Sequence, residues 1–156
     1  MHDTADTQTA QGAYSMQIVL PVDGSSFTTR AAQVLVQQVR QYAVPPQIVL
    51  FTVARPIGTP LARAQLSKAT LDTYYSDVSA QALAPAEAVL RDAGLTFAAH
   101  HAVGDPAEQI AAEIKRLQPD LVIMGTHGHS ALKGFVMGSV ASKVVASTTV
   151  PVLLVR

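Results

Sequence analysis

Residues 17–26 read QIVLPVDGSS, a short apolar run followed by a turn. The run at 17–22 is rich in β-branched side chains and lacks polar alternation, which is typical of a strand buried on both faces. Asp, Gly and Ser at 23–26 favour a turn and the start of a helix. A helical pattern follows and ends before Pro45. This order of strand, turn and helix predicts the first unit of an α/β fold.

The same alternation of strands and helices continues to the end of the chain. The patterns predict further strands at 47–53, 97–103, 121–124 and 150–155, and helices at about 67–93, 106–117 and 139–147. Pro85 predicts a kink or a break into two helices, and the Pro and Gly residues of 54–66 predict a loop. We therefore expect one doubly wound, five-stranded parallel sheet in the order 3-2-1-4-5, with helices on both faces.

The composition excludes several classes of protein. At 156 residues the chain has the length of one domain, and 49% apolar against 14% charged residues excludes disorder for its body. Eleven basic and eleven acidic side chains cancel, which argues against binding to nucleic acid or to a membrane surface. Without Cys there are no disulfides or thiolate sites, and no apolar run reaches the roughly 18 residues that cross a bilayer. Residues 1–15 are polar, so we expect a flexible N-terminal tail, a domain at 16–156 and a cytoplasmic location.

The expected fold predicts where a ligand binds. In a doubly wound sheet the binding crevice lies at the carboxyl ends of the strands, where the winding direction reverses. Here the reversal falls between the first and fourth strands, and the residues just past them are Asp23 and Gly125. Topology and local sequence therefore indicate the same place.

A glycine-rich loop follows the fourth strand, and residues 124–139 read MGTHGHSALKGFVMGS. Gly125 and Gly128 permit tight turns and close approach of a ligand. Gly138 and Ser139 open the last helix, whose free N–H groups and positive dipole end suit phosphate. Plain turn geometry explains these glycines equally well. The chain has neither a Walker A loop nor Gly-x-Gly-x-x-Gly after the first strand.

The spacing Gly125-x2-Gly128-x9-Gly138-Ser139 resembles the nucleotide loop of the ATP-binding branch of the universal stress protein family. The segments VDGS at 22–25, GDPA at 104–107 and PVLLV at 151–155 are also similar, in the right order over residues 16–156. The resemblance implies an adenine nucleotide alpha hydrolase-like fold. It also implies ATP, with Mg²⁺, as the ligand, and a homodimer formed through the C-terminal strand.

The resemblance also assigns roles to residues. Asp23 would hold the ribose hydroxyls, although capping of the following helix is an alternative role for it. Val53 would present its backbone to the adenine edge. The remaining positions of the implied site lie near the ribose and phosphates or beside Asp23: Pro21, Val22, Met124, Gly125, His127, Gly128, Gly138, Ser139 and Val140.

Three positions depart from the family pattern. Thr52 stands where many members have His, which alters the adenine pocket. His127 stands where relatives often have Arg, and a neutral imidazole supplies less charge to a phosphate. Ala141 replaces a Ser or Thr and removes one hydroxyl contact. Both of the last two changes predict weaker phosphate binding.

Catalytic and metal sites find no support in the sequence. His100, His101, His127 and His129 lack the spacing of a zinc site. Ser130 and Ser139 have no evident His–Asp partner, and Lys133 reads as a solvated loop residue.

Three functions remain open. The first is an ATP-binding stress-response regulator that is not an enzyme or hydrolyses ATP slowly at most. The second is a member of the same family that binds no nucleotide and acts as a dimeric interaction module. The third is an enzyme of a related nucleotide-handling group, such as an adenylating ligase, for which the chain is short.

Overall fold

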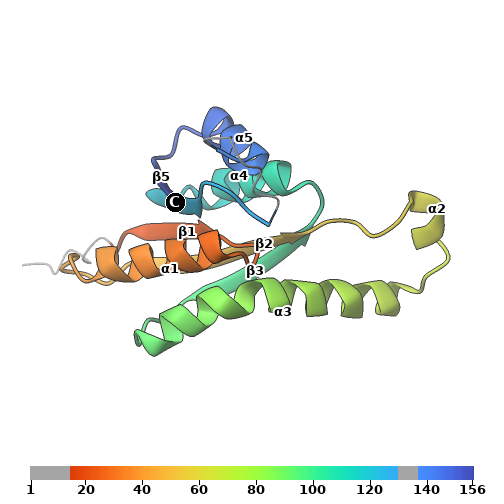
Figure 1. Ribbon diagram of the computed structural model, residues 1–156, viewed down its shortest axis with the longest axis horizontal. Helices are drawn as coiled ribbons and strands as arrows, with labels where there is room; N and C mark the ends of the chain where they lie inside the picture. Colours follow the sequence, from red (N-terminus) through yellow and green to blue (C-terminus); the bar gives the residue numbers. More distant parts are fainter. Residues whose placement is uncertain (1–14, 130–136) are drawn as a thin grey trace, which may run out of the picture.

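A five-stranded parallel sheet forms the centre of the computed structural model, which describes residues 15–129 and 137–156 (Figure 1). The strand order is β3-β2-β1-β4-β5, so the predicted fold class and order are confirmed. The strands are β1 (Gln17–Pro21), β2 (Gln47–Ala54), β3 (Ala98–Val103), β4 (Leu121–Gly125) and β5 (Val152–Val155). The tail expected at 1–15 falls almost wholly outside the described residues, as do Ser130 and Lys133.

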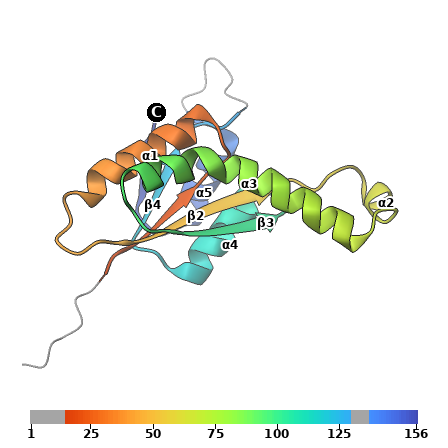
Figure 2. The ribbon, with the colours of Figure 1, turned by 90° about the horizontal axis from the view of Figure 1, so that it is seen from below.

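Helices cover both faces of the sheet (Figures 1 and 2). Helices α1 (Ser26–Val39) and α3 (Lys68–Asp92) lie on one face, and α4 (Pro106–Leu117) and α5 (Ser139–Ser147) lie on the other. The short helix α2 (Pro60–Arg63) lies between β2 and α3. In the described part of the chain, no helix is both long and apolar enough to cross a membrane.

The central strands are buried on both sides because successive side chains enter different cores. Ile18 and Leu20 pack with α1 and α3, whereas Val19 packs with α4 and α5. Each of these three side chains is fully buried. Burial of such a side chain contributes about 1.5–3 kcal/mol. The unbroken apolar run at 17–22 is therefore the consequence of a strand with two cores to fill.

Helix α3 runs continuously for 25 residues through Pro85, so the expected break into two helices is wrong. Proline removes one helical hydrogen bond and costs about 3 kcal/mol in a helix interior. The buried residues Ser79, Leu83, Ala86 and Leu90 lie on both sides of Pro85 at helical spacing. Packing of this continuous stripe outweighs the local cost of the proline.

The segment expected to be a loop at 54–66 contains α2. Thr59 caps it by accepting a hydrogen bond from Ala62 N, and Pro60 occupies the first turn, where proline is tolerated. The helix and the start of α3 project beyond the sheet (Figures 1 and 2). Arg63 donates to the carbonyls of Ile57 and Gly58, so the projecting segment is held by its own contacts.

Two leucine substitutions test where stability resides. Leu50→Ala should lower the free energy of unfolding by about 2–5 kcal/mol, because Leu50 is fully buried. Leu61→Ala, at a side chain that is 76% exposed, should change it by less than about 0.5 kcal/mol. Urea denaturation of both variants measures the difference. Equal losses of unfolding free energy in the two variants would show that the projecting segment is packed as tightly as the core.

Candidate functional site

The sheet opens at the carboxyl ends of β1 and β4, where its winding direction reverses. These strands pair only at Ile18 with Leu121 and at Val19 with Val122. Pro21 is the next residue of β1 whose backbone faces β4, and it has no N–H to donate. Pairing therefore stops, and the segments that follow the two strands are free to diverge around a crevice.

Asp23 lies on one side of this crevice and forms the turn before α1. Its Oδ1 accepts a hydrogen bond from Ser25 N at 2.9 Å. The hydroxyl of Ser25, the alternative helix cap, is buried and has no hydrogen-bond partner among the residues that the structure describes. Asp23 therefore stabilises the turn with one oxygen, while its Oδ2 is left for another role.

Gly128 faces Asp23 from the other side of the crevice. A Cβ at residue 128 would collide with Asp23 Oδ2, so a larger residue there would force the Asp23 carboxylate to move. The neighbouring His129 places Nε2 2.7 Å from the backbone oxygen of Asp23. The loop after β4 is thereby held directly against the turn after β1.

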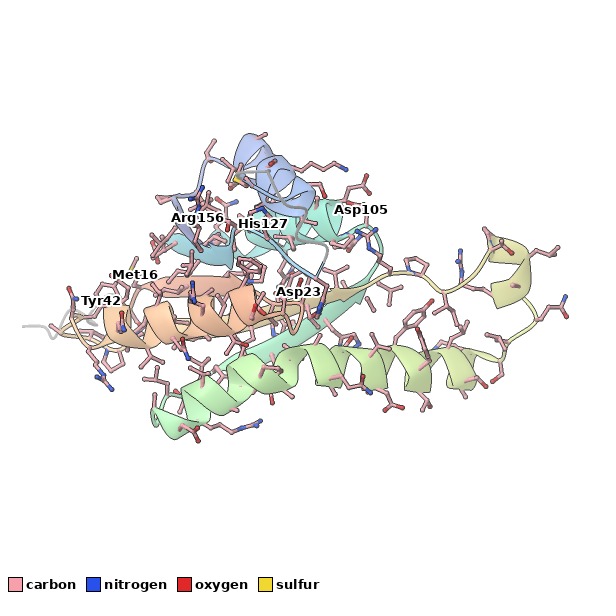
Figure 3. All side chains as sticks on the ribbon, viewed as in Figure 1. Met16, Asp23, Tyr42, Asp105, His127 and Arg156 are labelled. Carbon is pink, nitrogen blue, oxygen red and sulfur yellow. The ribbon has the colours of Figure 1, made fainter. Side chains whose placement is uncertain are left out.

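His127 and Asp23 lie at the same end of the sheet (Figure 3). The His127 ring is half-buried against Phe27 of α1, with ring centroids 5.3 Å apart. Its Nδ1 lies 3.1 Å from Thr126 Oγ1. A Cβ on Gly125 would come within 2.8 Å of Phe27 Cβ. Gly125 is thus needed for packing against α1, whatever else it contacts.

The start of α5 offers free amides beside this loop. Gly138 N donates to Thr126 O at 2.7 Å, so its amide is already used within the protein. Ser142 N donates to the Gly138 carbonyl and closes the first turn. Within 15–129 and 137–156, the N–H groups of residues 139–141 have no acceptor. The amides of Ser139 and Val140 therefore suit an anion, together with the positive end of the helix dipole.

Val53 completes the arrangement on the β2 side. Val22 N donates to Phe51 O, so the backbone of residue 53 also faces β1, but β1 has ended there. Neither its N–H nor its carbonyl has a partner in the part of the chain that the structure describes. One donor and one acceptor side by side match the edge of an adenine ring.

Three predicted site residues contribute at most their backbones. The side chains of Val22 and Met124 are buried in the two cores, and Pro21 is buried between them. Among the described residues, no three His, Asp or Glu side chains are grouped so as to hold a metal ion.

Sequence reasoning missed the parts played by Phe27, Thr126 and His129. Thr126 and His129 belong to the glycine-rich loop, and their position alone marked them as candidates. Phe27 had no such signal, because its contacts with Gly125 and His127 join residues about a hundred positions apart.

Comparison with known proteins identifies relatives over nearly the whole chain. The sequence model of the universal stress protein family matches residues 15–156. A universal stress protein of Thermus aquaticus is 33% identical over 89% of this chain and 97% of its own length. Another, of Methanocaldococcus jannaschii, is 26% identical over 90% of this chain and 81% of its own length.

Solved structures share the fold. A second protein of Methanocaldococcus jannaschii superposes with a TM-score of 0.75 at 23% identity, covering 90% of this chain and 94% of its own. A universal stress protein solved with cAMP gives a TM-score of 0.66 at 23% identity, over 90% and 97% of the two chains. One from Archaeoglobus fulgidus solved with dAMP gives 0.58 at 18%, over 92% and 98%.

Paired substitutions test the contact between Asp23 and Gly128. Gly128→Ala should lower the free energy of unfolding by about 1–3 kcal/mol, because the new methyl group collides with the Asp23 carboxylate. In an Asp23→Ala background, which itself loses the hydrogen bond from Ser25 N, Gly128→Ala should cost much less, giving a coupling energy of about 1 kcal/mol in a double-mutant cycle. Thermal and urea denaturation provide the values. Strict additivity of the two changes would show that the side chain and the loop do not touch.

Proposed function

Because the chain belongs to the universal stress protein family, we propose that it binds an adenine nucleotide, ATP with Mg²⁺, in the crevice between β1 and β4 and acts as a regulator in the stress response. Members of this family are generally not enzymes, in agreement with the prediction that the chain is not one. The observation that carries the proposal is the contact of Asp23 with Gly128 beside three free amides of α5.

The residues present fit the parts of a nucleotide. The free backbone groups of Val53 would pair with the adenine edge, and Asp23 Oδ2 would accept a hydrogen bond from a ribose hydroxyl. The amides of Ser139 and Val140 would bind phosphate oxygens at the helix terminus. Gly128 leaves room for this approach because it has no side chain.

In phosphate sites Mg²⁺ keeps several waters and takes few protein ligands. The ion would therefore be held mainly by the phosphates, whose negative charge it would offset. His127 supplies imidazole where relatives often have Arg, and its ring packs on Phe27. Phosphate affinity then rests on amides rather than on a permanent charge. No water-activating base is assigned, so hydrolysis would be slow at most.

Two related structures were solved with cAMP and with dAMP, which supports an adenine nucleotide for this chain as well. The cytoplasmic location expected from the composition stays a prediction.

Calorimetric titration tests the nucleotide. ATP with Mg²⁺ should bind saturably at about one site per chain, and Asp23→Ala should weaken binding about tenfold, the loss expected for a hydrogen bond to a charged group. The same variant should bind ATP and dATP alike, whereas the unaltered protein prefers ATP if Asp23 contacts the 2′-hydroxyl. Asp92→Ala, an exposed carboxylate at the end of α3, serves as the control.

Absence of heat or thermal shift at millimolar ATP would reject nucleotide binding and favour the alternative, a dimeric protein-interaction module. Unchanged discrimination between ATP and dATP in Asp23→Ala would remove the ribose role from Asp23 alone.

We also propose that the protein is a homodimer joined through β5. This strand lies at the sheet edge, where Val122 of β4 and Thr126, just after β4, donate to the carbonyls of Pro151 and Val155. By alternation, the backbones of Val152 and Leu154 face outward. An apolar edge with free backbone groups pairs readily with the same strand of a second copy about a two-fold axis.

Val152→Pro tests the dimer, because it removes one outward N–H while keeping an apolar side chain on an edge strand. Sedimentation should give twice the monomer mass for the unaltered protein at micromolar concentration and the monomer mass for the variant. His101→Pro makes the same change at the opposite sheet edge and should stay dimeric. A dimer indifferent to Val152→Pro places the interface elsewhere.

A further inference from the structure

A second polar cluster lies far along the sheet from the nucleotide crevice, between β3 and α4. Glu113 of α4 accepts two hydrogen bonds from Arg116, at 2.8 and 2.7 Å. Its Oε1 also lies 3.0 Å from Nδ1 of His100 on β3. The Glu113 side chain is only 11% exposed, whereas Arg116 is 59% and His100 41% exposed. The carboxylate is therefore enclosed by its two partners.

The charge state of the cluster follows from these bonds. The hydrogen bonds from Arg116 hold the pKa of Glu113 below its usual range, with a smaller contribution from His100 and against the effect of burial. An ionised Glu113 accepts, so Nδ1 of His100 carries the proton that it donates. Both Glu113 oxygens are thus engaged, while within 15–129 and 137–156 no residue bonds to Nε2 of His100 or to the remaining guanidinium hydrogens of Arg116.

These groups line a surface cavity of about 330 Å³. Phe51, Ala102 and Ala112 form its apolar wall, and Gln109 adds an amide. Helix α4 packs against β2, and the His100 side chain on β3 is 41% exposed, so that side of β3 is only partly covered. The cavity is consequently open along the outer edge of the sheet.

The edge itself has free backbone groups. Gly104 N donates to Ala54 O, so by alternation Ala102 and His100 face β2, and His101 and Val103 face outward. In the described part of the chain no strand pairs with that side of β3. Such an edge is a template for a further strand.

We propose that β3 docks an extended peptide segment of a partner protein, added as a further strand, with an acidic side chain of that segment inserted in the cavity. Backbone hydrogen bonds to His101 and Val103 supply affinity, and the cavity supplies specificity, as in other cases of strand addition. An added strand points alternate side chains toward α4 and so toward Arg116 and His100.

Charge complementarity selects a carboxylate. Within the cavity lining the one acidic group, Glu113, already accepts from two partners, and Arg116 and Gln109 supply the remaining side-chain donors. A carboxylate accepts two hydrogen bonds from such groups at once. A second copy of β3 does not fit, because its sequence, AAHHAV, carries no acidic residue.

Two blocked peptides test the proposal, acetyl-TVEVT-amide and its glutamine counterpart acetyl-TVQVT-amide, titrated into the full chain and followed by amide NMR shifts. The glutamate peptide should bind about tenfold more tightly than the glutamine peptide, as expected for one charge-assisted contact. Shifts should concentrate on β3 and α4 and leave β5 unchanged.

Three variants locate the contacts. Arg116→Gln should remove the preference for glutamate, and Lys115→Gln, which removes the same charge from the neighbouring exposed position, should retain it. His101→Pro should abolish binding of both peptides, while Val152→Pro on the opposite edge should bind like the unaltered protein. Circular dichroism confirms that each variant is folded.

Several outcomes would overturn the proposal: equal binding of the two peptides, retained binding by His101→Pro, or no binding at millimolar peptide. Glutarate binding as tightly as the glutamate peptide would also overturn it, because the cavity would then hold a small carboxylate without strand addition. None of these measurements depends on whether a nucleotide binds between β1 and β4.

Discussion

The interrupted pairing of β1 with β4 is the constraint on which the rest of the molecule depends. Both strands are central and bury side chains on two faces. They pair at two positions, and this pairing joins the two halves of the sheet. Pro21 then withholds the N–H that would continue the ladder. Because the chain winds in opposite directions from these strands, the turn at Asp23 and the loop at Gly128 meet with no element between them. Proline in the sequence of β1 thus sets the position of the candidate site.

The features that follow from the local pattern of apolar residues were predicted well from the sequence. Strand positions follow from apolar runs, and their order follows from the winding rule, so the meeting of Asp23 and Gly128 was accessible in advance. Pro85 was misread because a local cost was weighed without the tertiary packing of α3 on both sides of it. Helix α2 was overlooked although Thr59 and Pro60 carry a capping signal. The contacts of Phe27 with Gly125 and of His100 with Glu113 depend on long-range packing, and no pattern in one sequence encodes them.

The glycines of the loop have a role in packing within the protein, apart from any contact with a ligand. The missing side chains of Gly125 and Gly128 leave room for Phe27 and for the Asp23 carboxylate. A Cβ added to Gly138 would lie 3.2 Å from the Thr126 carbonyl oxygen. The two explanations offered for a glycine-rich loop, turn geometry and ligand approach, are therefore not alternatives here. The same close packing that excludes side chains leaves backbone amides and one carboxylate oxygen as the groups that face the crevice.

Thr126 links this site to the edge of the sheet. Its N–H donates to Val155 at the end of β5, and its carbonyl accepts from Gly138 at the start of α5, at 2.8 and 2.7 Å. A phosphate drawn to the first turn of α5 would act on Gly138, and Gly138 is held by the residue that also holds β5. Movement of Thr126 must therefore stretch or shift one of these two bonds. At the opposite edge, β3 is separated from the crevice by β2 and β1 within the sheet. If the proposed nucleotide and dimer interface are both present, the interface on β5 would be coupled to the nucleotide through Thr126.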